Sequence, residues 1–338
     1  MRKIIFKEGM IMLNIGVDVG GTTIKMALVT DQGEITHKWN IPTNTDENGK
    51  SIVRDISRSI IQQRAAFNVK DSEIRGVGLG VPGFINVDSG FIYDAVNLGW
   101  KNYSIRDELE QLLSLPVVIE NDANAAALGE MWLGAGKNAE NMVCVTLGTG
   151  IGGGIIVNGD ILHGISGMAG ELGHLTVKHN GGARCNCGKT GCLETISSAT
   201  GIRRMALEGV NEHSESLLYR LYQKEGDISS ENVFNCAEEG DAFALALVDQ
   251  AAYYLGSALG TLSVVLNPER IIIGGGVSNA GETLTRPLIR YFKASSLPRI
   301  VDSCSIDLAK LGNDAGVIGC AWLSMKRLKR NEFVHLSK

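Results

Sequence analysis

Proline is scarce in this chain, with 6 prolines against 42 glycines among 338 residues. Turns are therefore built from flexible rather than rigid residues. Basic residues form no long run and the net charge is -5, which argues against nucleic acid or an anionic membrane as a main partner. No stretch approaches the roughly 20 apolar residues of a membrane span.

The first residues also lack the features of a secretory signal, because their apolar stretch is short and no small-residue cleavage site follows it. We therefore expect a cytoplasmic protein. Met1, Met10 and Met12 precede the first predicted strand, and Lys7-Glu8-Gly9 can be encoded by a purine-rich run that resembles a bacterial ribosome-binding site. We hypothesise that native translation begins at Met10 or Met12.

The length and a hydrophobic content of 44% exceed the needs of one ordinary core and predict two domains. Ile52, Ile56, Ile60 and Ile61 recur at helical spacing and predict an amphipathic helix. Residues 105–113 and the alanine-rich segment 241–266 are also predicted to be helical, the latter as a buried helix. Residues 97–100 are predicted to form a loop.

One strand-to-helix junction organises the remaining motifs. A short apolar run, 115–119, ends on Glu120-Asn121-Asp122-Ala123-Asn124 and leads into a helix-forming segment. This order places the Asp122 carboxylate at the carboxyl end of a strand, where open α/β sheets bind ligands. Helix capping alone could explain an acid at this position, so neighbouring motifs must decide between the two interpretations.

Two glycine turns each join a pair of predicted strands. Gly20-Gly21-Thr22-Thr23 follows strand 13–19, and a second turn begins with Gly148-Thr149-Gly150 after strand 142–147. Neither is a Walker loop or a Rossmann turn, because those open a helix. Such turns can hold phosphate through backbone N–H groups, although an ordinary hairpin has similar residues. Their joint occurrence predicts a duplicated architecture with one turn from each half facing a common cleft.

Two further stretches of the sequence contain closely spaced glycines. Gly78, Gly80 and Gly83 fit G-x-G-x-x-G, but no helix is predicted after them, so we expect a strand whose terminal turn approaches a ligand rather than a dinucleotide site. A strand over residues 269–273 runs into Gly274-Gly275-Gly276, which would let a ligand approach the backbone closely.

Three of the seven cysteines, Cys185, Cys187 and Cys192, lie within eight residues. In a cytosolic chain such a cluster indicates metal before disulfide. A closed tetrahedral zinc site needs one more ligand, and His174 and His179 are in reach, with His163 a poorer candidate. Zinc here would be structural, since such a ligand set leaves no open position; the alternative is a cluster of free thiols.

Together these motifs resemble the ROK family of sugar kinases and sugar-responsive repressors, in the actin-like ATPase superfamily, and most closely its glucokinase branch. The resemblance extends over nearly the whole chain. It is carried by Asp18 to Thr22, Glu120 to Asn124, Leu147 to Gly150, Gly170-Glu171-Leu172-Gly173-His174, the Cys-x-Cys-Gly-x-x-Gly-Cys-x-Glu run that ends at Glu194, Asn97 to Trp100, and Leu311 to Gly316.

The resemblance implies an α/β protein with the actin-like ATPase (ribonuclease H-like) fold and two lobes around a catalytic cleft. Residues 1–122 plus 315–338 would form the small lobe. Residues 123–314 would form the large lobe, which carries the zinc-binding loop and a dimer surface. The family also suggests a homodimer.

The activity implied is ATP-dependent phosphorylation of glucose to glucose 6-phosphate, with Asp122 as general base. Within the family pattern, His174 rather than His179 completes the zinc set with Cys185, Cys187 and Cys192. The sugar-binding residues implied are Gly83, Asn97, Asn121, Asp122, Glu171, His174 and Glu194.

The resemblance also implies an ATP site with Mg²⁺. Gly20, Gly21, Thr22, Thr23, Gly148, Thr149 and Gly150 would hold the phosphates, and Gly274, Gly275 and Gly276 would line the adenosine pocket. Asp18 would lie in the Mg²⁺ shell, through water. Lys25 fits the family pattern without an assigned role.

Three alternatives remain open at this point. The sugar could be fructose, allose, N-acetylmannosamine or N-acetylglucosamine, and the donor could be polyphosphate, as for some family members. The repressors of the family carry a winged helix-turn-helix ahead of the first glycine turn. Only 17 residues precede Asp18, and their pattern is not helical, which argues against a repressor.

Overall fold

The computed structural model describes residues 12–336, with side chains described as far as residue 328. Of the candidate start sites, Met1 and Met10 lie outside the described residues. The chain divides into two compact units. Unit 1 comprises Met1–Asn138, Ile161–Ala169 and Asn313–Lys338, and unit 2 comprises Ala139–Asp160 and Gly170–Gly312.

Unit 1 is built on a five-stranded sheet with the strand order β3-β2-β1-β4-β8. The first three strands pair antiparallel, and β1, β4 and β8 pair parallel. Central β4 is buried along its whole length, whereas edge strand β3 alternates between half-buried and exposed residues, as expected for a strand with one solvated face. The strands are β1 (Leu13–Val19), β2 (Thr23–Thr30), β3 (Ile35–Pro42), β4 (Ile74–Val81) and β8 (Val117–Asn121).

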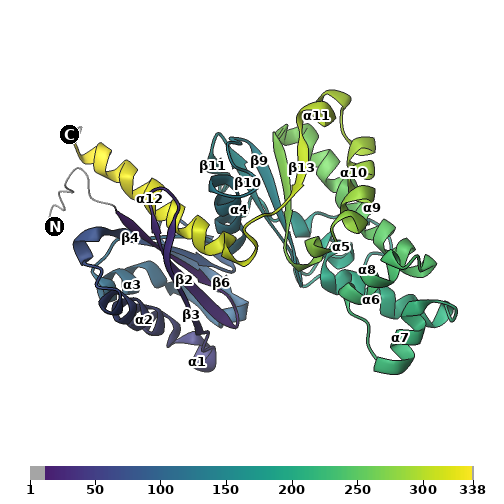
Figure 1. The fold of residues 1–338 in the computed structure, drawn as a ribbon, viewed down its shortest axis with the longest axis horizontal. Coiled ribbons are helices and arrows are strands. Elements are labelled where there is room, and N and C mark those ends of the chain that lie inside the picture. Colours follow the sequence, from purple (N-terminus) through teal and green to yellow (C-terminus); the bar gives the residue numbers. More distant parts are fainter. Residues whose placement is uncertain (1–11, 337–338) are drawn as a thin grey trace. The chain divides into compact units, whose positions relative to one another are not determined.

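Helix α12 (Ala315–Leu336) packs across this sheet, against β1 and β4, and α4 (Asp122–Trp132) packs on α12 (Figure 1). The approach is close because glycines face the helix. A β-carbon on Gly16 would lie 2.0 Å from the Val317 carbonyl oxygen, and one on Gly78 would lie 1.8 Å from that of Cys320. Gly78, the first glycine of the G-x-G-x-x-G pattern, therefore packs against a helix, in agreement with the rejection of a dinucleotide site.

Unit 1 also contains α1 (Asp46–Gly49), α2 (Ile52–Ala66), α3 (Ile105–Leu113) and a three-stranded sheet of β5 (Phe84–Asn86), β6 (Phe91–Ala95) and β7 (Trp100–Ser104). Ile52, Ile56 and Ile60 are fully buried, as predicted for one helix face, while Ile61 is 50% exposed. The predicted loop at 97–100 is only partly right. Residues 96–98 form a 3₁₀ turn, but Trp100 begins β7 and is buried.

Unit 2 repeats the same sheet pattern, β11-β10-β9-β12-β13, in which β9 and β10 form the antiparallel hairpin and β9, β12 and β13 are parallel. The predicted duplication is therefore present in the strand order, and the α/β, actin-like fold class is confirmed. The strands are β9 (Met142–Leu147), β10 (Ile151–Val157), β11 (Asp160–Ile161), β12 (Arg270–Gly274) and β13 (Ser305–Leu308).

Helix α9 (Ala242–Leu266) is the central helix of unit 2, and α8 (Ser230–Glu238) and α10 (Glu282–Ser295) pack against it (Figure 1). Asp241 caps α9 by accepting the Ala244 N–H at 2.8 Å. By length and composition alone α9 could cross a membrane, although the sequence analysis found no apolar stretch of that length. One side of the helix, however, belongs to the core of unit 2. The other helices are α5 (Glu194–Ser197), α6 (Ala199–Gly209), α7 (Leu217–Glu225) and α11 (Pro298–Ser303).

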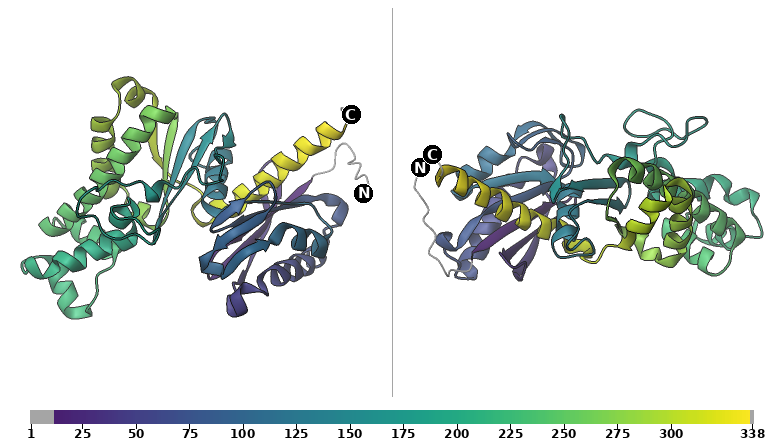
Figure 2. Two further views of the ribbon diagram at one scale, coloured as in Figure 1. Left: turned by 180° about the vertical axis from the view of Figure 1, so that it is seen from behind. Right: turned by 90° about the horizontal axis from the view of Figure 1, so that it is seen from above.

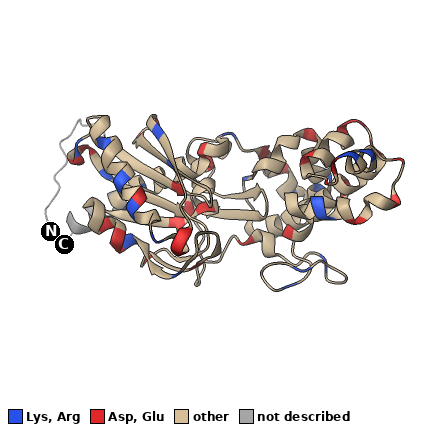
Figure 3. Ribbon diagram, turned by 90° about the horizontal axis from the view of Figure 1, so that it is seen from below, with Lys and Arg blue, Asp and Glu red and all other residues tan. Residues whose placement is uncertain are grey.

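The division into units differs from the boundary expected between residues 122 and 123. Helix α4 groups with unit 1 because it packs on α12 through small residues: a β-carbon on Gly129 would lie 2.1 Å from the Ala315 carbonyl oxygen. Residues 161–169 also group with unit 1, where Gly167 approaches the Ile85 carbonyl. Charged positions of both signs are interspersed along the ribbon of each unit (Figure 3).

Candidate functional site

The Asn121–Asp122 junction divides two tasks between two neighbouring residues. Asn121 is the N-cap of α4: its Oδ1 accepts the backbone N–H groups of Ala123 at 2.9 Å and Asn124 at 3.2 Å. Asp122 is the first residue of the helix, beyond the cap. Asn121 is therefore the N-cap, and Asp122, which only shares the Ala123 N–H with it, is not needed as a cap.

The Asp122 carboxylate is half-buried at the carboxyl end of β8, where it accepts the Ala123 N–H at 2.9 Å. Burial raises its pKa above the ordinary value, and hydrogen bonds from Ala123 and the Asn121 side chain offset only part of this effect. A partly desolvated carboxylate with increased proton affinity is suited to accept a proton from a substrate hydroxyl.

A second acid, Asp18, stands at the end of β1. Burial raises its pKa to about 6, the positive charge of Lys25 lowers it, and the negative charge of Asp122 raises it. Lys25 is directly opposite Asp18 in the β1–β2 ladder and donates to the Asn313 carbonyl at 3.2 Å. The structure therefore gives Lys25 a place as the nearby countercharge of Asp18.

The first glycine turn follows Asp18 directly. The Gly20 N–H donates to the Thr23 carbonyl at 3.1 Å, and the Thr43 hydroxyl donates to the Gly20 carbonyl at 2.7 Å. Thr43 was not identified from the sequence, because it lies 20 residues beyond the turn and only strand pairing brings it there. Gly21 is next to Asn97, with 3.8 Å between a β-carbon on Gly21 and that of Asn97.

Gly83 joins this group through its carbonyl, which accepts the Asn121 Nδ2 at 3.3 Å. Its backbone has φ 109, and a β-carbon would lie 2.2 Å from the Asp94 carbonyl oxygen, so only glycine fits. Gly83, Asn121 and Asp122 thus form one connected group, with Gly21 and Asn97 forming another within unit 1.

In unit 2 the second glycine turn is held from two sides. The Gly148 N–H donates to the Gly150 carbonyl at 2.9 Å, and the Ala199 N–H, at the start of α6, donates to the Gly148 carbonyl at 2.9 Å. Glu194 Oε2 accepts the Ile151 N–H at 2.9 Å, and a β-carbon on Gly150 would lie 2.2 Å from that oxygen. Glu194, predicted to bind sugar, therefore also supports the turn that contains Thr149.

The glycines after β12 lie beside the same turn. Gly275 has φ 84, and a β-carbon there would lie 2.4 Å from the Leu147 carbonyl oxygen, directly before Gly148. The Ser278 hydroxyl donates to the Gly275 carbonyl at 2.7 Å. Gly274, Gly275 and Gly276 are thus placed, like Gly148, at the carboxyl end of the unit 2 sheet, the edge where open α/β sheets bind ligands.

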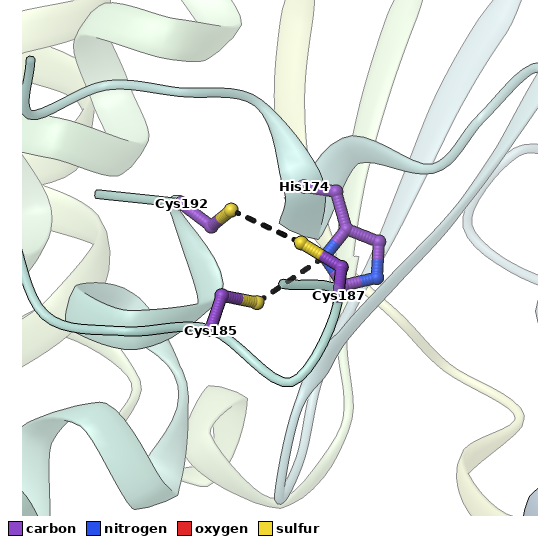
Figure 4. A group of neighbouring side chains, drawn as sticks. All are labelled: His174, Cys185, Cys187 and Cys192. Carbon is purple, nitrogen blue, oxygen red and sulfur yellow. Dashed lines mark hydrogen bonds between the residues drawn. The ribbon is translucent and has the colours of Figure 1, made fainter. Parts of the chain in front are cut away.

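His174, Cys185, Cys187 and Cys192 converge in unit 2 (Figure 4), and one ligand atom from each lies within 4.8 Å of all the others. His174 Nδ1 is 3.6 Å from Cys185 Sγ, and Cys187 Sγ is 3.6 Å from Cys192 Sγ. A tetrahedral site with metal–sulfur bonds of about 2.3 Å has ligand–ligand edges of roughly 3.8 Å. The four donors therefore fit a zinc ion, and among the described residues His174, not His179, completes the set.

The loop that carries the cysteines is nearly free of regular structure, as Figure 2 shows, and is shaped by glycines and hydrogen bonds. Gly191 has φ 72 and lies against the Lys178 carbonyl. The Lys189 ammonium donates to the His174 carbonyl at 2.7 Å. Burial, together with the neighbouring thiols, raises the pKa of Cys192 to about 12. The thiolate form of Cys192 therefore needs a bound cation to stabilise it at neutral pH.

The second nitrogen of the His174 imidazole faces away from the thiols. His174 Nε2 lies 3.9 Å from Glu171 Oε2, and both side chains are partly exposed. A metal on Nδ1 would fix the ring and its tautomer and leave Nε2 free for a ligand hydroxyl. Cys185 Sγ is also 3.9 Å from Glu194 Oε1, which places Glu171, His174 and Glu194 around one cluster.

A sequence model of the ROK family matches residues 14–327. The chain is 56% identical over 309 residues to a glucokinase of Halalkalibacterium halodurans, covering 91% of this chain and 94% of that protein. The crystal structure of a ROK family glucokinase from Streptomyces griseus in complex with glucose and AMPPNP superimposes with a TM-score of 0.74 and 33% identity, covering 93% of this chain and 99% of that one.

Repressors are also among the similar proteins. A xylose repressor of Caldicellulosiruptor bescii is 30% identical over 310 residues, which cover 90% of this chain but 76% of the repressor. About a quarter of the repressor's length therefore has no counterpart in the match, whereas the glucokinase is covered almost completely.

Proposed function

The chain belongs to the ROK family, and we propose that it catalyses transfer of the terminal phosphoryl group of ATP to glucose, giving glucose 6-phosphate. The observation that carries this proposal is the half-buried Asp122 carboxylate at the end of β8, whose pKa is raised and which is not the N-cap of α4. A sugar hydroxyl has a pKa far above neutrality, so its attack on phosphorus requires a positioned proton acceptor. The 56% identity to a glucokinase favours glucose as the sugar.

In this proposal Asp122 accepts the proton of the attacking hydroxyl as the oxygen–phosphorus bond forms, and ADP leaves. Asn121, Gly83 and Asn97 orient the sugar from unit 1. Asn121 is well placed for this, because its Oδ1 is used for capping and its Nδ2 contacts the Gly83 carbonyl, which fixes the side chain. Phosphoryl transfer depends mainly on such positioning and on charge neutralisation.

The nucleotide is assigned to the two glycine turns. Backbone N–H groups and hydroxyls of Gly20, Gly21, Thr22, Thr23, Gly148, Thr149 and Gly150 would bind phosphate oxygens, and Gly274, Gly275 and Gly276 would line the adenosine pocket. Mg²⁺ supplies neutralisation of the phosphate charge when bound. Asp18, in the ionised form at neutral pH given its pKa of about 6, would hold the ion's water shell.

Unit 2 contributes sugar contacts that depend on zinc. Glu171, His174 and Glu194 would bind glucose hydroxyls, and Cys185, Cys187 and Cys192 with His174 would hold the ion. Zinc supplies structural cross-linking of the loop when bound. Because Glu194 also accepts the Ile151 N–H, the same side chain couples the sugar contacts of unit 2 to its glycine turn.

Purified protein should be tested in a coupled assay that detects sugar phosphate, with ATP and Mg²⁺ and a panel of glucose, fructose, allose, N-acetylglucosamine and N-acetylmannosamine. We expect kcat/KM for glucose to exceed that for each other sugar by about tenfold or more, since lost sugar contacts cost roughly that factor each. Polyphosphate in place of ATP tests the donor. A higher kcat/KM for an N-acetylhexosamine would reassign the substrate.

We further propose a cytoplasmic homodimer with its dimer surface on the large lobe, within the residues of unit 2. Support for a dimer surface on the large lobe comes from α9, where Leu245, Tyr253 and Val265 are 45%, 47% and 77% exposed. Large exposed apolar side chains gathered on one element are typical of interaction surfaces. Light scattering of Val265→Glu against wild type tests this: a dimeric variant would contradict the use of Val265.

A further inference from the structure

Glu120 is a buried acid that follows three apolar residues in β8. It precedes Asn121 and Asp122 in β8, is 0% exposed, and has had no role so far. An uncompensated carboxylate at such a position would be strongly destabilising. The groups that surround the Glu120 carboxylate therefore indicate its role.

The Glu120 carboxylate accepts four hydrogen bonds, which match the four acceptor positions of an ionised carboxylate. Oε1 accepts the Asn121 backbone N–H at 3.1 Å and the Asn124 side-chain amide at 3.0 Å. Oε2 accepts His163 Nε2 at 2.8 Å and the Arg327 guanidinium at 3.2 Å. Every donor belongs to unit 1.

The two oxygens connect different parts of unit 1. Oε1 holds the first turn of α4, on both sides of Asp122 in sequence. Oε2 is held by His163, from segment 161–169, and by Arg327, from α12. The side chains of His163 and Arg327 are 21% and 26% exposed, whereas that of Glu120 is fully buried. His163 and Arg327 therefore fix the Glu120 carboxylate, and this carboxylate fixes the first turn of α4.

This arrangement bears on Asp122 because the latter's hydrogen-bond partners, Ala123 and Asn121, are its chain neighbours. The direction of the Asp122 carboxylate thus follows the backbone of the turn. We propose that Glu120 is a positioning residue for phosphoryl transfer, and that His163 and Arg327 act through it by fixing its carboxylate. The inference rests on the proposed function, in which Asp122 is the general base.

The first test is Glu120→Gln, which keeps the shape of the side chain but presents an amide where an oxygen meets His163 and Arg327. A displacement of the reacting groups by about 1 Å can cost roughly 100-fold in rate. We expect kcat to fall about 10- to 100-fold while KM for glucose changes less than about threefold, because the turn is misaligned but the sugar contacts of unit 2 are intact.

Glu130→Gln is the matched control. Glu130 is 1% exposed, lies further along α4 and accepts the Ala135 N–H at 2.8 Å. Its substitution should lower the melting temperature without lowering kcat at 25 °C. If Glu120→Gln behaves in the same way, with kcat unchanged, Glu120 is a stability residue and the inference is wrong.

The second test uses His163, which is more exposed than Glu120, so that it does not depend on the folding of Glu120→Gln. His163→Gln can donate from its Nε2 toward Glu120, whereas His163→Ala cannot. We expect His163→Ala to lower kcat about tenfold and His163→Gln to restore most of it. Equal kcat values for Ala, Gln and wild type would overturn the part assigned to His163.

These outcomes are separate from the proposed function. A wild-type protein that phosphorylates none of the sugars removes the kinase proposal itself. An active wild type with a fully active Glu120→Gln removes only the positioning role.

Discussion

Unit 1 and unit 2 share a strand order but differ in the chemistry at the carboxyl ends of their strands. In unit 1 the penultimate residue of β1 is Asp18, and β8 leads to Asp122, so two half-buried acids with raised pKa values stand there. In unit 2 the penultimate residue of β9 is Thr146, and the cluster of one imidazole and three thiols follows the hairpin instead. The same strand order therefore presents a pair of carboxylates in one unit and a set of donors that fits a metal ion in the other.

The comparison predicts that damage to unit 1 appears in kcat and damage to unit 2 in stability and substrate affinity. The largest effect should come from Asp122→Asn, which removes the proton acceptor but keeps the shape of the side chain. We expect kcat to fall about 10²- to 10⁴-fold, with glucose affinity by calorimetry and the melting temperature retained. Asp46→Asn, at an exposed acid of the same unit, is the control. Turnover near wild type in Asp122→Asn would remove the general-base assignment.

The next effect concerns the metal cluster of unit 2. Cys187→Ser should abolish zinc binding, raise KM for glucose about tenfold through the loss of His174 orientation, and lower the melting temperature by several degrees. Elemental analysis gives the zinc content. Cys304→Ser, at a thiol outside the cluster, should leave all three quantities unchanged. A fully active wild type without metal would refute structural zinc.

A smaller effect, on KM, distinguishes Gly150 from Gly148, the two ends of the second glycine turn. In Gly150→Ala the new methyl group would displace Glu194, whose Oε2 would lie 2.2 Å from it. Overpacking of this kind costs about 1–3 kcal/mol. Because Glu194 is a proposed sugar ligand, KM for glucose should rise roughly tenfold. A β-carbon on Gly148 meets nothing within 4 Å, so Gly148→Ala should leave KM for glucose unchanged and raise only KM for ATP. Equal changes in the two variants would contradict the link through Glu194.

The last effect is on stability rather than on turnover, and it is a pH dependence of stability in the ligand-free protein. Asp18 has a folded-state pKa of about 6 against an ordinary 3.8, so its contribution to folding is present below pH 4 and is lost as pH rises to about 6. The difference corresponds to roughly 3 kcal/mol. Asp18→Asn should therefore melt a few degrees above wild type at pH 7 and close to it at pH 4. A Tm difference that is the same at both pH values would contradict the burial effect.

Sequence reasoning found the features that local pattern determines. The isoleucines of α2, the bounds of α3 and both glycine turns follow from periodicity and turn chemistry, and these elements are where they were predicted. The three cysteines pointed to a metal site for the same reason, since a short loop keeps its ligands together.

Features that depend on distant pairing were missed. The sheet of β5, β6 and β7 consists of strands of 3–5 residues, too short for a clear alternation. The sequence motif contained Glu120, but its partners His163 and Arg327 lie 43 and 207 residues away. Asn121 and Asp122 are equally plausible caps on composition, and only backbone geometry shows which one caps.

The packing of α12 into the glycine-lined surface of Gly16 and Gly78 has a consequence for biosynthesis. The sheet of unit 1 is complete once β8 has been translated, yet the helix that covers it is translated only after the whole of unit 2. Unit 2, whose own strands and helices are all available earlier, can become native while the ribosome is still extending the chain. Unit 1 must keep an uncovered apolar sheet until then, so chaperone binding to nascent chains should concentrate on its first four strands.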